Sequence, residues 1–293
     1  MKRRLYTLDV FTAKAFHGNP LAVVTDGDGL SNGTMQAIAR EMNLAETVFV
    51  QRPTHNRALA RLRIFTTTRE LPLAGHPVIG TWFLLAELGV VPAAEGTVHV
   101  LQQTGAGILP VEFMFHDGRP KLVTMTQKPA KFVRPKLKPA ALADALGLKA
   151  SDFAADLPLE FVSTGISNLM APLKNRAALG KIHLNMRALA QTLSSSATMA
   201  YCFALGGRGK AFARGMLPWG IMEDPATGSA GGSLGAYLVR HERLRAGEEL
   251  VIAQGIEMGR PSEIHAEIMD VRGRLVPKVS GSAVRILEAH IDV

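Results

Sequence analysis

Apolar and polar residues alternate along much of the chain, which is the pattern of strands that bury one face. In the first half this period of two predicts strands at residues 5–11, 21–24, 47–50, 59–66, 97–102, 108–115 and 121–125. Two stretches change to helical spacing: one begins at Ser31, a residue type that caps helices, and the other begins at Gly75. Asp117-Gly118 predicts a tight hairpin between the last two strands.

The second half repeats this plan of elements. It has predicted strands at residues 161–164, 169–173, 199–205, 210–214, 249–253, 263–271, 274–280 and 283–287, and predicted helices at 140–146, 185–193 and 229–240. Gly75 and Ser229, at the starts of two matching helices, lie 154 positions apart, and the helical patterns that begin at 31 and 185 have the same offset. Few residues are identical between the two halves, so what repeats is the order of predicted strands and helices and not the amino-acid sequence itself.

This repeat predicts an α+β protein of two similar domains. Short strands outnumber the helices and do not alternate with them regularly, which argues against βαβ units. We place the first domain at residues 1–118 and the second at 119–281. For the last strand, at about residues 282–293, a return to the first domain stays open.

Each of the two matching helices follows a short motif with Pro and Gly. The motifs are Glu70-Leu71-Pro72-Leu73-Ala74-Gly75-His76-Pro77 and Glu223-Asp224-Pro225-Ala226-Thr227-Gly228-Ser229-Ala230. Backbone N–H groups in the first turn of a helix attract carboxylates and other anionic oxygens. We expect the two helices to point these groups at one shared cleft. The alternative is an ordinary helix start at which Thr227 or Ser229 is the cap.

Composition and charge narrow the class of protein. The chain has 293 residues, of which 47% are hydrophobic, and this suits two domains of ordinary size. Part of the net charge of +8 lies at residues 128–138, a Pro-rich run that we interpret as a solvated linker between the domains. A nucleic-acid binder would need stacking aromatics, and only Phe132 interrupts the run. We therefore expect no nucleic-acid partner.

We expect a cytoplasmic protein without a membrane partner. No apolar run reaches the roughly 20 residues that cross a bilayer. The basic start at residues 1–4 is not followed by the apolar stretch of a signal peptide. The single cysteine, Cys202, cannot form a disulfide within the chain, which fits a reducing compartment.

Several familiar chemistries lack their motifs here. Ala211 follows Lys210 where a phosphate loop needs Ser or Thr, and no Gly-x-Gly-x-x-Gly supports a nicotinamide or flavin. The histidines show no metal-ligand spacing. Ser229 lacks one Gly of a nucleophile elbow, and Cys202, in an apolar run, is expected to be inert core. We therefore expect no cofactor and no metal.

Acid–base chemistry by carboxylates and His remains, with three candidates. Glu46 stands between a helical pattern and an apolar strand; it is either a surface loop residue or a partly buried acid/base whose pKa burial would raise. His76 and Asp224 stand at the two helix starts. A positive helix N-terminus favours a carboxylate, so Asp224 should stay ionised.

Several of these segments resemble the PhzF-like isomerases, a family with the diaminopimelate-epimerase fold. Asn43-Leu44-Ala45-Glu46-Thr47 is similar to the catalytic-glutamate segment of the family, and the two helix-start motifs are similar to its central motifs. Residues 8–12 and 16–24 look like its opening, and Met258-Gly259-Arg260-Pro261-Ser262 like its late motif. Ala45 and Leu73 stand where Ser and Phe are common, which leaves the substrate open.

The resemblance implies two pseudo-symmetric domains, each a β-barrel-like sheet around a central helix, with the active site between them and usually a homodimer. It implies that Glu46 is the general acid/base that moves a proton between carbons of a small carboxylated substrate, with or without an amino group. His76 and Asp224 would position or relay the proton, while Gly75 and the turn of Thr227, Gly228 and Ser229 would hold the substrate carboxylate.

The activity implied in this way is that of a cofactor-independent isomerase, with trans-2,3-dihydro-3-hydroxyanthranilate as one candidate substrate. Racemases of this fold carry a cysteine at each helix start, and this chain has none there. The alternative function is a non-catalytic or regulatory protein that binds a small molecule in the same cleft.

Overall fold

The chain folds into two compact units. The computed structural model describes residues 2–92 and 94–293, so Met1 of the basic start lies outside the described residues. The first unit is formed by Met1–Met125 together with Ser280–Val293, and the second by Thr126–Val279. Among the described residues, no helix combines the length and the apolar character needed to span a membrane.

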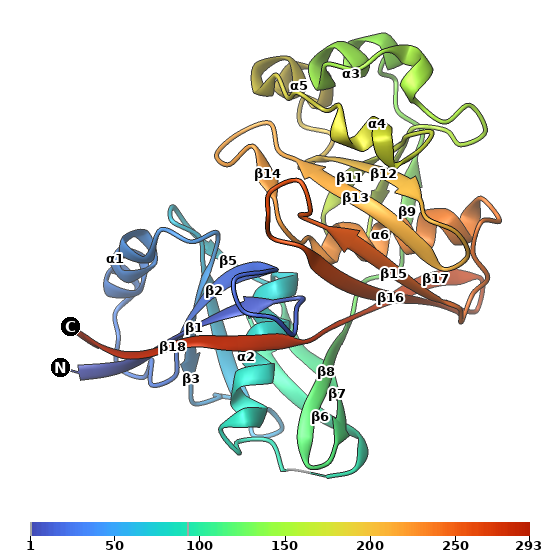
Figure 1. Cartoon of the computed structure of the whole chain (residues 1–293). Helices are drawn as coiled ribbons and strands as arrows, with labels where there is room; N and C mark the ends of the chain where they lie inside the picture. The colour runs from blue at the N-terminus through green and yellow to red at the C-terminus, as the bar shows by residue number, and fades with distance from the viewer. Residues whose placement is uncertain (1, 93) are drawn as a thin grey trace. The chain divides into compact units, whose positions relative to one another are not determined.

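The first unit is a curved sheet around one central helix, α2 (Gly75–Glu87). Neighbouring strands follow the order β18-β1-β2-β3-β4-β6-β7-β8, and β5 adds to β4. The strands are β1 (Lys2–Val10), β2 (Asn19–Val24), β3 (Thr47–Gln51), β4 (Ala60–Phe65), β5 (Glu70–Leu71), β6 (Gly96–Thr104), β7 (Gly107–His116), β8 (Arg119–Thr126) and β18 (Ala283–Asp292). Because β1 pairs with β18, the two ends of the chain lie side by side in this unit (Figure 1).

The second unit has the same plan around helix α6 (Gly228–Arg240). Its strand order is β9-β10-β11-β12-β13-β15-β16-β17, and β14 adds to β13. The strands are β9 (Lys131–Val133), β10 (Glu160–Ser163), β11 (Ser167–Pro172), β12 (Ala200–Leu205), β13 (Lys210–Met216), β14 (Glu223–Asp224), β15 (Glu249–Gln254), β16 (Ser262–Val271) and β17 (Arg274–Gly281).

The predicted α+β class and the repeat of two barrel-like units are therefore confirmed. One detail differs from the prediction. The sequence argues against βαβ units, but each unit contains two pairs of parallel strands that are joined through helices. These pairs are β2–β3 and β4–β6 in the first unit, and β11–β12 and β13–β15 in the second. Two neighbouring parallel strands need a long connection that returns the chain to the same end of the sheet, and the helices between them provide it.

The remaining helices cover the outside of the sheets. In the first unit, α1 (Asn32–Met42) begins after Ser31, whose hydroxyl accepts the Thr34 N–H as its predicted cap. In the second unit, the short helices lie together beside β11 and β12 (Figure 1); they are α3 (Pro139–Leu146), α4 (Arg176–Gly180) and α5 (Met186–Leu193), with a 3₁₀ turn at Ala150–Asp152.

The interpretation of the basic run at residues 128–138 as a linker was wrong for the part that joins the sheet of the second unit. Residues Lys131–Val133 form β9, which pairs with β10. The backbone N–H of Lys128 donates to Thr164, and that of Ala130 donates to Leu275. Residues 128–133 are therefore built into the wall of the second unit. Such a short strand has too few residues to show a period, and only its neighbours make it a strand.

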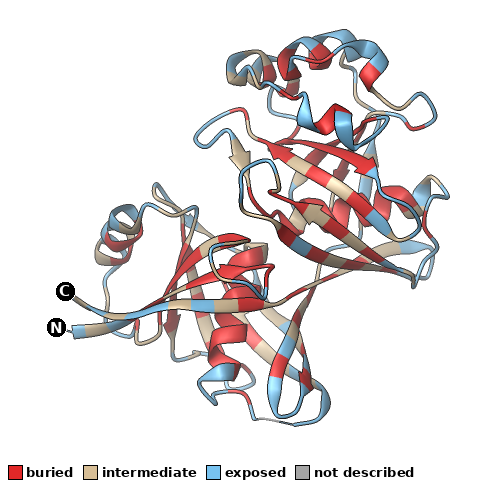
Figure 2. Ribbon diagram, in the orientation of Figure 1, coloured by how far each residue is buried: buried red, intermediate tan, exposed pale blue. Residues whose placement is uncertain are grey.

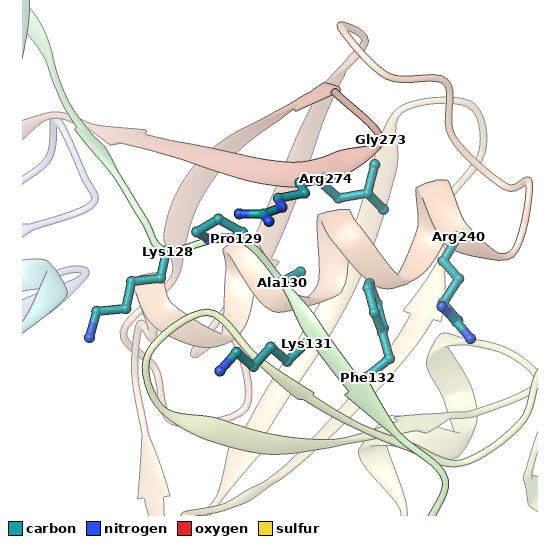
Figure 3. Close-up of a pocket in the computed structure, with 9 residues that line it drawn as sticks. Lys128, Pro129, Ala130, Lys131, Phe132, Arg240, Gly273 and Arg274 are labelled. Atoms are coloured by element: carbon teal, nitrogen blue, oxygen red, sulfur yellow. The ribbon is translucent and has the colours of Figure 1, made fainter. Parts of the chain in front are cut away.

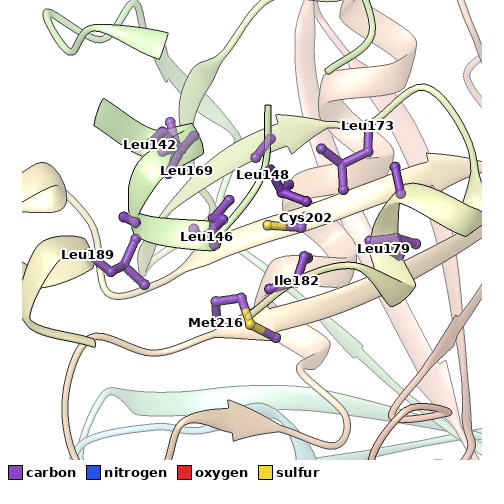
Figure 4. Close-up of a cluster of buried hydrophobic side chains, with 14 of the residues drawn as sticks. Leu142, Leu146, Leu148, Leu169, Leu173, Leu179, Ile182, Leu189, Cys202 and Met216 are labelled. Atoms are coloured by element: carbon purple, nitrogen blue, oxygen red, sulfur yellow. The ribbon is translucent and has the colours of Figure 1, made fainter. Parts of the chain in front are cut away.

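The predicted inert environment of Cys202 is confirmed. Cys202 lies on β12 inside a cluster of buried apolar side chains that α3, α4 and α5 contribute to (Figure 4). The thiol is fully buried, and burial raises its pKa to about 12. A thiol with this pKa is not ionised at neutral pH and does not act as a nucleophile.

Both central helices pack closely against their sheets, and Figure 2 shows α2 buried along its length. At Gly80, in the middle of α2, a Cβ atom would lie 2.5 Å from Cγ2 of Val10 and 2.8 Å from Cδ2 of Leu21. We expect Gly80→Ala to lower the free energy of unfolding by about 1–3 kcal/mol, because an overpacked core must shift. Urea denaturation measures this change.

The matched control is Gly33→Ala on the exposed side of α1, where the nearest atom to the added Cβ is Ser31 Oγ at 3.8 Å. Alanine restricts the unfolded chain, so this variant should be neutral or gain up to about 1 kcal/mol. Equal effects of the two substitutions would show that α2 is not closely packed.

Candidate active site

The first part of the site is the start of α2. Its N-cap residue, Ala74, makes no side-chain hydrogen bond to the first turn, and Gly75 is partly exposed. The first-turn N–H groups of a helix have no acceptor within the helix. This helix start is therefore suited to bind an anionic oxygen such as a carboxylate.

Glu46 and His76 meet at this helix start. Glu46 directly precedes β3, and its side chain is 17% exposed. Its Oε2 lies 3.4 Å from Nε2 of His76, which is buried in the first turn of α2. On the other side of the ring, Nδ1 of His76 lies 3.3 Å from Nδ2 of the buried Asn19. The amide nitrogen can only donate, so Nδ1 accepts and the ring proton sits on Nε2, facing Glu46.

The turn before Asn19 explains how this amide reaches His76. Gly18 has a φ of +63°, and a Cβ atom there would lie 2.2 Å from the carbonyl oxygen of Val10. Only glycine fits this close approach without strain. The chain can therefore turn sharply out of β1 and begin β2 with Asn19 under the start of α2. Sequence reasoning did not select Asn19; the available signal was an amide placed before an apolar strand.

His76 is neutral in the folded protein. Burial lowers the pKa of its imidazole to about 3. An ionised Glu46 at 3.4 Å acts in the opposite direction, because a nearby anion favours the imidazolium, but burial is the larger effect. The neutral ring lies beside the Glu46 carboxylate, with Nε2 3.4 Å from Oε2, and places no full positive charge next to it.

We expect this buried imidazole to make the folded state sensitive to mild acid. Its pKa in the folded protein is about 3, below the ordinary value of about 6.5, so the unfolded chain binds more protons under mildly acidic conditions. The free energy of unfolding should therefore fall by about 2 kcal/mol between pH 6.5 and 5. In His76→Gln this part of the pH dependence should disappear. Urea denaturation at several pH values tests this, and equal slopes in the two proteins would contradict it.

The second part of the site is the start of α6, where Thr227 holds the N-cap position without capping the helix. Its hydroxyl donates to Oδ2 of Asp224 at 2.5 Å, and its backbone N–H donates to Oε1 of Gln254 at 3.2 Å. The predicted alternative of Thr227 as an ordinary cap is therefore wrong. Gly228 and Ser229 begin the first turn, and Ser229 is partly exposed.

Gln254 organises this second helix start, and sequence reasoning missed it. The side chain is fully buried at the end of β15. Its Nε2 donates to the Asp224 carbonyl at 2.7 Å and to Thr227 Oγ1 at 3.0 Å, while Oε1 accepts the Tyr201 hydroxyl at 2.8 Å. Burial raises the pKa of Tyr201, so its phenol stays a donor. A polar residue that ends an otherwise apolar strand was the available signal.

The glutamates that open the two motifs have the same partner in both units. In the first unit, Arg63 Nε donates to Glu70 at 2.6 Å and its Nη2 donates to the second oxygen at 2.6 Å. In the second unit, Arg214 makes the same two bonds to Glu223, at 2.9 and 2.7 Å. A two-pronged contact of this kind fixes a carboxylate in one orientation. Glu70 and Glu223 therefore hold the short strands β5 and β14 in place ahead of the helix starts.

The predicted site residues thus form two groups. Glu46, Gly75 and His76 lie together in the first unit. Asp224, Thr227, Gly228 and Ser229 lie together in the second unit. Within the described parts of the chain, no group of three or more His, Cys, Asp or Glu residues is placed to hold a metal ion.

Comparison with known proteins places this arrangement in a family. Residues 8–289 match the family described as phenazine biosynthesis-like protein (PhzC-PhzF). The chain is 36% identical over 288 residues to the trans-2,3-dihydro-3-hydroxyanthranilate isomerase of Pseudomonas aeruginosa, covering 98% of each chain. A PhzF-family phenazine biosynthesis protein of Bacillus anthracis has a similar crystal structure, with a TM-score of 0.90, 27% identity and complete coverage of both chains.

A more distant structure shares the fold alone. The hydroxyproline epimerase of Agrobacterium vitis superimposes with a TM-score of 0.66 at 14% identity, covering 99% of this chain and 92% of the epimerase. The close relatives have both the sequence and the fold of this protein over nearly its whole length. The chain therefore belongs to the phenazine biosynthesis-like (PhzC-PhzF) family, and it is an isomerase with the fold of the amino-acid epimerases.

Proposed function

We propose that this isomerase moves a proton between two carbons of a small carboxylated substrate, with Glu46 as the general acid/base and without a cofactor. The observation that carries the proposal is the pair of Glu46 and His76 beside the uncapped start of α2. A carboxylate that is partly shielded from water and lies beside a neutral imidazole is suited to proton transfer. A binding protein would need the N–H groups of the helix but not the acid/base.

The proposed reaction balances without any other reagent. The Glu46 carboxylate takes a proton from an activated carbon, and the electron pair of the broken C–H bond shifts into the substrate's conjugated system. The protonated Glu46 then returns the proton to a different carbon, which regenerates the carboxylate. His76 forms a neutral wall beside the Glu46 carboxylate, and first-turn N–H groups at Gly75 hold the substrate's own carboxylate.

The proposal extends to the second helix start, with Asp224 and the turn of Thr227, Gly228 and Ser229 acting on the same substrate. Support comes from the repeat of the plan in both units and from the family membership. We also propose a cytoplasmic homodimer. The single cysteine fits a reducing compartment, and the family resemblance implies the dimer, which light scattering after size-exclusion chromatography tests. If both helix starts act on one substrate, Asp224→Asn should lower turnover although Glu46 and His76 are unchanged. Full activity of this variant would restrict the site to the first unit.

The first substrate to test is trans-2,3-dihydro-3-hydroxyanthranilate, because relatives at 36 and 37% identity carry the name of its isomerase. Proton NMR in D₂O follows the reaction directly, together with a panel of cyclic unsaturated amino acids. Deuterium that enters one ring carbon would establish proton transfer and name the substrate class. Binding of these compounds without any exchange would favour the non-catalytic alternative.

A further inference from the structure

The second unit contains a groove where its barrel is open along one seam. Strands β9 and β17 approach each other at one end, where Ala130 N–H donates to the Leu275 carbonyl at 2.8 Å. The groove lies beyond this bond, with a volume of about 680 Å³, and α6 passes behind it (Figure 3). Its walls come from Lys128–Phe132, from Gly273–Leu275 and from Arg240 at the end of α6. This volume lies within the range of about 300–1,000 Å³ that small-molecule sites occupy.

The groove is strongly cationic. Lys128, Lys131, Arg240 and Arg274 line it, and Arg272 lines a smaller pocket that adjoins it at Pro129 and Arg274. In the described part of the chain, the side chains of Lys128, Lys131 and Arg274 make no ion pair with a carboxylate. Cations gathered in one concavity without acidic partners attract anions. The basic run of the sequence, which the isomerase reaction does not use, supplies two of these cations.

The groove also has an apolar wall. The Arg240 guanidinium lies over the Phe132 ring, 4.6 Å from its centroid, and its Nε lies 3.5 Å from Glu160 Oε1. Half of the Arg240 side chain remains exposed. Pro129 and Leu275 continue the apolar surface. An arginine fixed over an aromatic ring offers its plane to another flat group as well as its charge.

We propose that this groove binds a small organic anion that carries two negative charges on a flat apolar body. The charges would meet Lys128, Lys131 and Arg274, and the body would lie along Phe132 and Arg240. A phosphate ester and an aromatic dicarboxylate share this chemistry. The site lies outside the groups assigned to proton transfer, so its ligand would be an effector and not the substrate that is isomerised.

Fluorescence titration with two probes at constant ionic strength tests the proposal and separates the two sources. The two probes are 1-naphthyl phosphate, which represents the phosphate esters, and naphthalene-1,4-dicarboxylate, which represents the dicarboxylates. Two control compounds separate the contributions: 1-naphthol has the flat apolar rings without the charge, and inorganic phosphate has the charge without the rings. The variants are Lys131→Gln, Arg274→Gln and their combination. Lys136→Gln is the matched control, because Lys136 is an exposed cation of the same basic run that does not line the groove.

We expect at least one of the two dianions to bind more tightly than 1-naphthol and phosphate. The double variant should weaken that binding about tenfold or more, since each lost charge-assisted contact contributes. Phe132→Leu should weaken the binding of the naphthyl dianions and leave the weak binding of inorganic phosphate unchanged. Circular dichroism confirms that the variants are folded.

Three results would overturn the proposal. One is the absence of binding by both dianions at millimolar concentration. Another is an equal loss in Lys136→Gln and in the groove variants, which would mean a diffuse attraction to the basic surface. The third is binding that survives the double variant but is lost on competition with the isomerase substrate, which would place the probe in the active site.

Discussion

Glu46→Gln should abolish turnover and leave the substrate bound. General acid/base catalysis contributes about 10²–10⁴-fold to a rate, and the amide cannot accept the substrate's proton. We therefore expect kcat to fall at least about a thousandfold, while the dissociation constant changes only slightly, because the first-turn N–H groups of α2 still hold the substrate carboxylate. The measurements are turnover by NMR and affinity by calorimetry.

The control for this variant is Glu41→Gln, which removes an exposed carboxylate from α1 without touching His76. It should match the wild type in turnover, affinity and stability. Substantial turnover in Glu46→Gln would remove Glu46 from the reaction. Loss of binding together with the absence of any turnover in the wild-type protein would instead support the non-catalytic function.

Arg214→Met should be among the most destabilising single substitutions in the second unit. The Arg214 and Glu223 side chains are only 12% and 10% exposed, and they are joined by two short bonds. Removal of one partner leaves a buried carboxylate without its counter-charge, which costs about 3–5 kcal/mol. Urea denaturation should show this loss. The double variant Arg214→Met/Glu223→Leu should recover most of it, since no charge then stays buried alone.

The equivalent pair in the first unit provides an internal comparison. Arg63 is as buried as Arg214, but the Glu70 side chain is 39% exposed. Water can solvate Glu70 after Arg63→Met, so the loss there should be nearer about 1 kcal/mol. If Arg214→Met also costs only this much, then Glu223 is solvated and the pair is not structurally important. Because Asp224 follows Glu223 on β14, Arg214→Met should in addition lower turnover.

Local chemistry explains why the sequence predicts so many elements well. Ser31 caps α1 through its hydroxyl, and Asn185 caps α5 through its side-chain amide oxygen. At the predicted hairpin, Asp117 and Gly118 both adopt positive φ, at 52° and 66°. These features depend only on residues that are close in the sequence, so they can be predicted from the sequence alone.

The short elements that hold the site in place were not predicted. Strands β5 and β14 have two residues each and show no periodicity, yet Arg63 and Arg214 fix them. The composition of the basic run predicts a linker, but pairing with β10 makes three of its residues a strand. In these cases a partner from elsewhere in the chain outweighs local preference.

The sequence by itself determined the class of fold, the repeat, and the residue types that can perform acid–base chemistry, because these follow from periodicity and side-chain chemistry. The tertiary structure decided which polar groups meet. Asn19 reaches His76 across 57 positions, and Gln254 joins Thr227 across 27. Hydrogen bonds act over about 3 Å, so a role that depends on a partner, such as the tautomer of His76, is settled only when the fold brings the two atoms together.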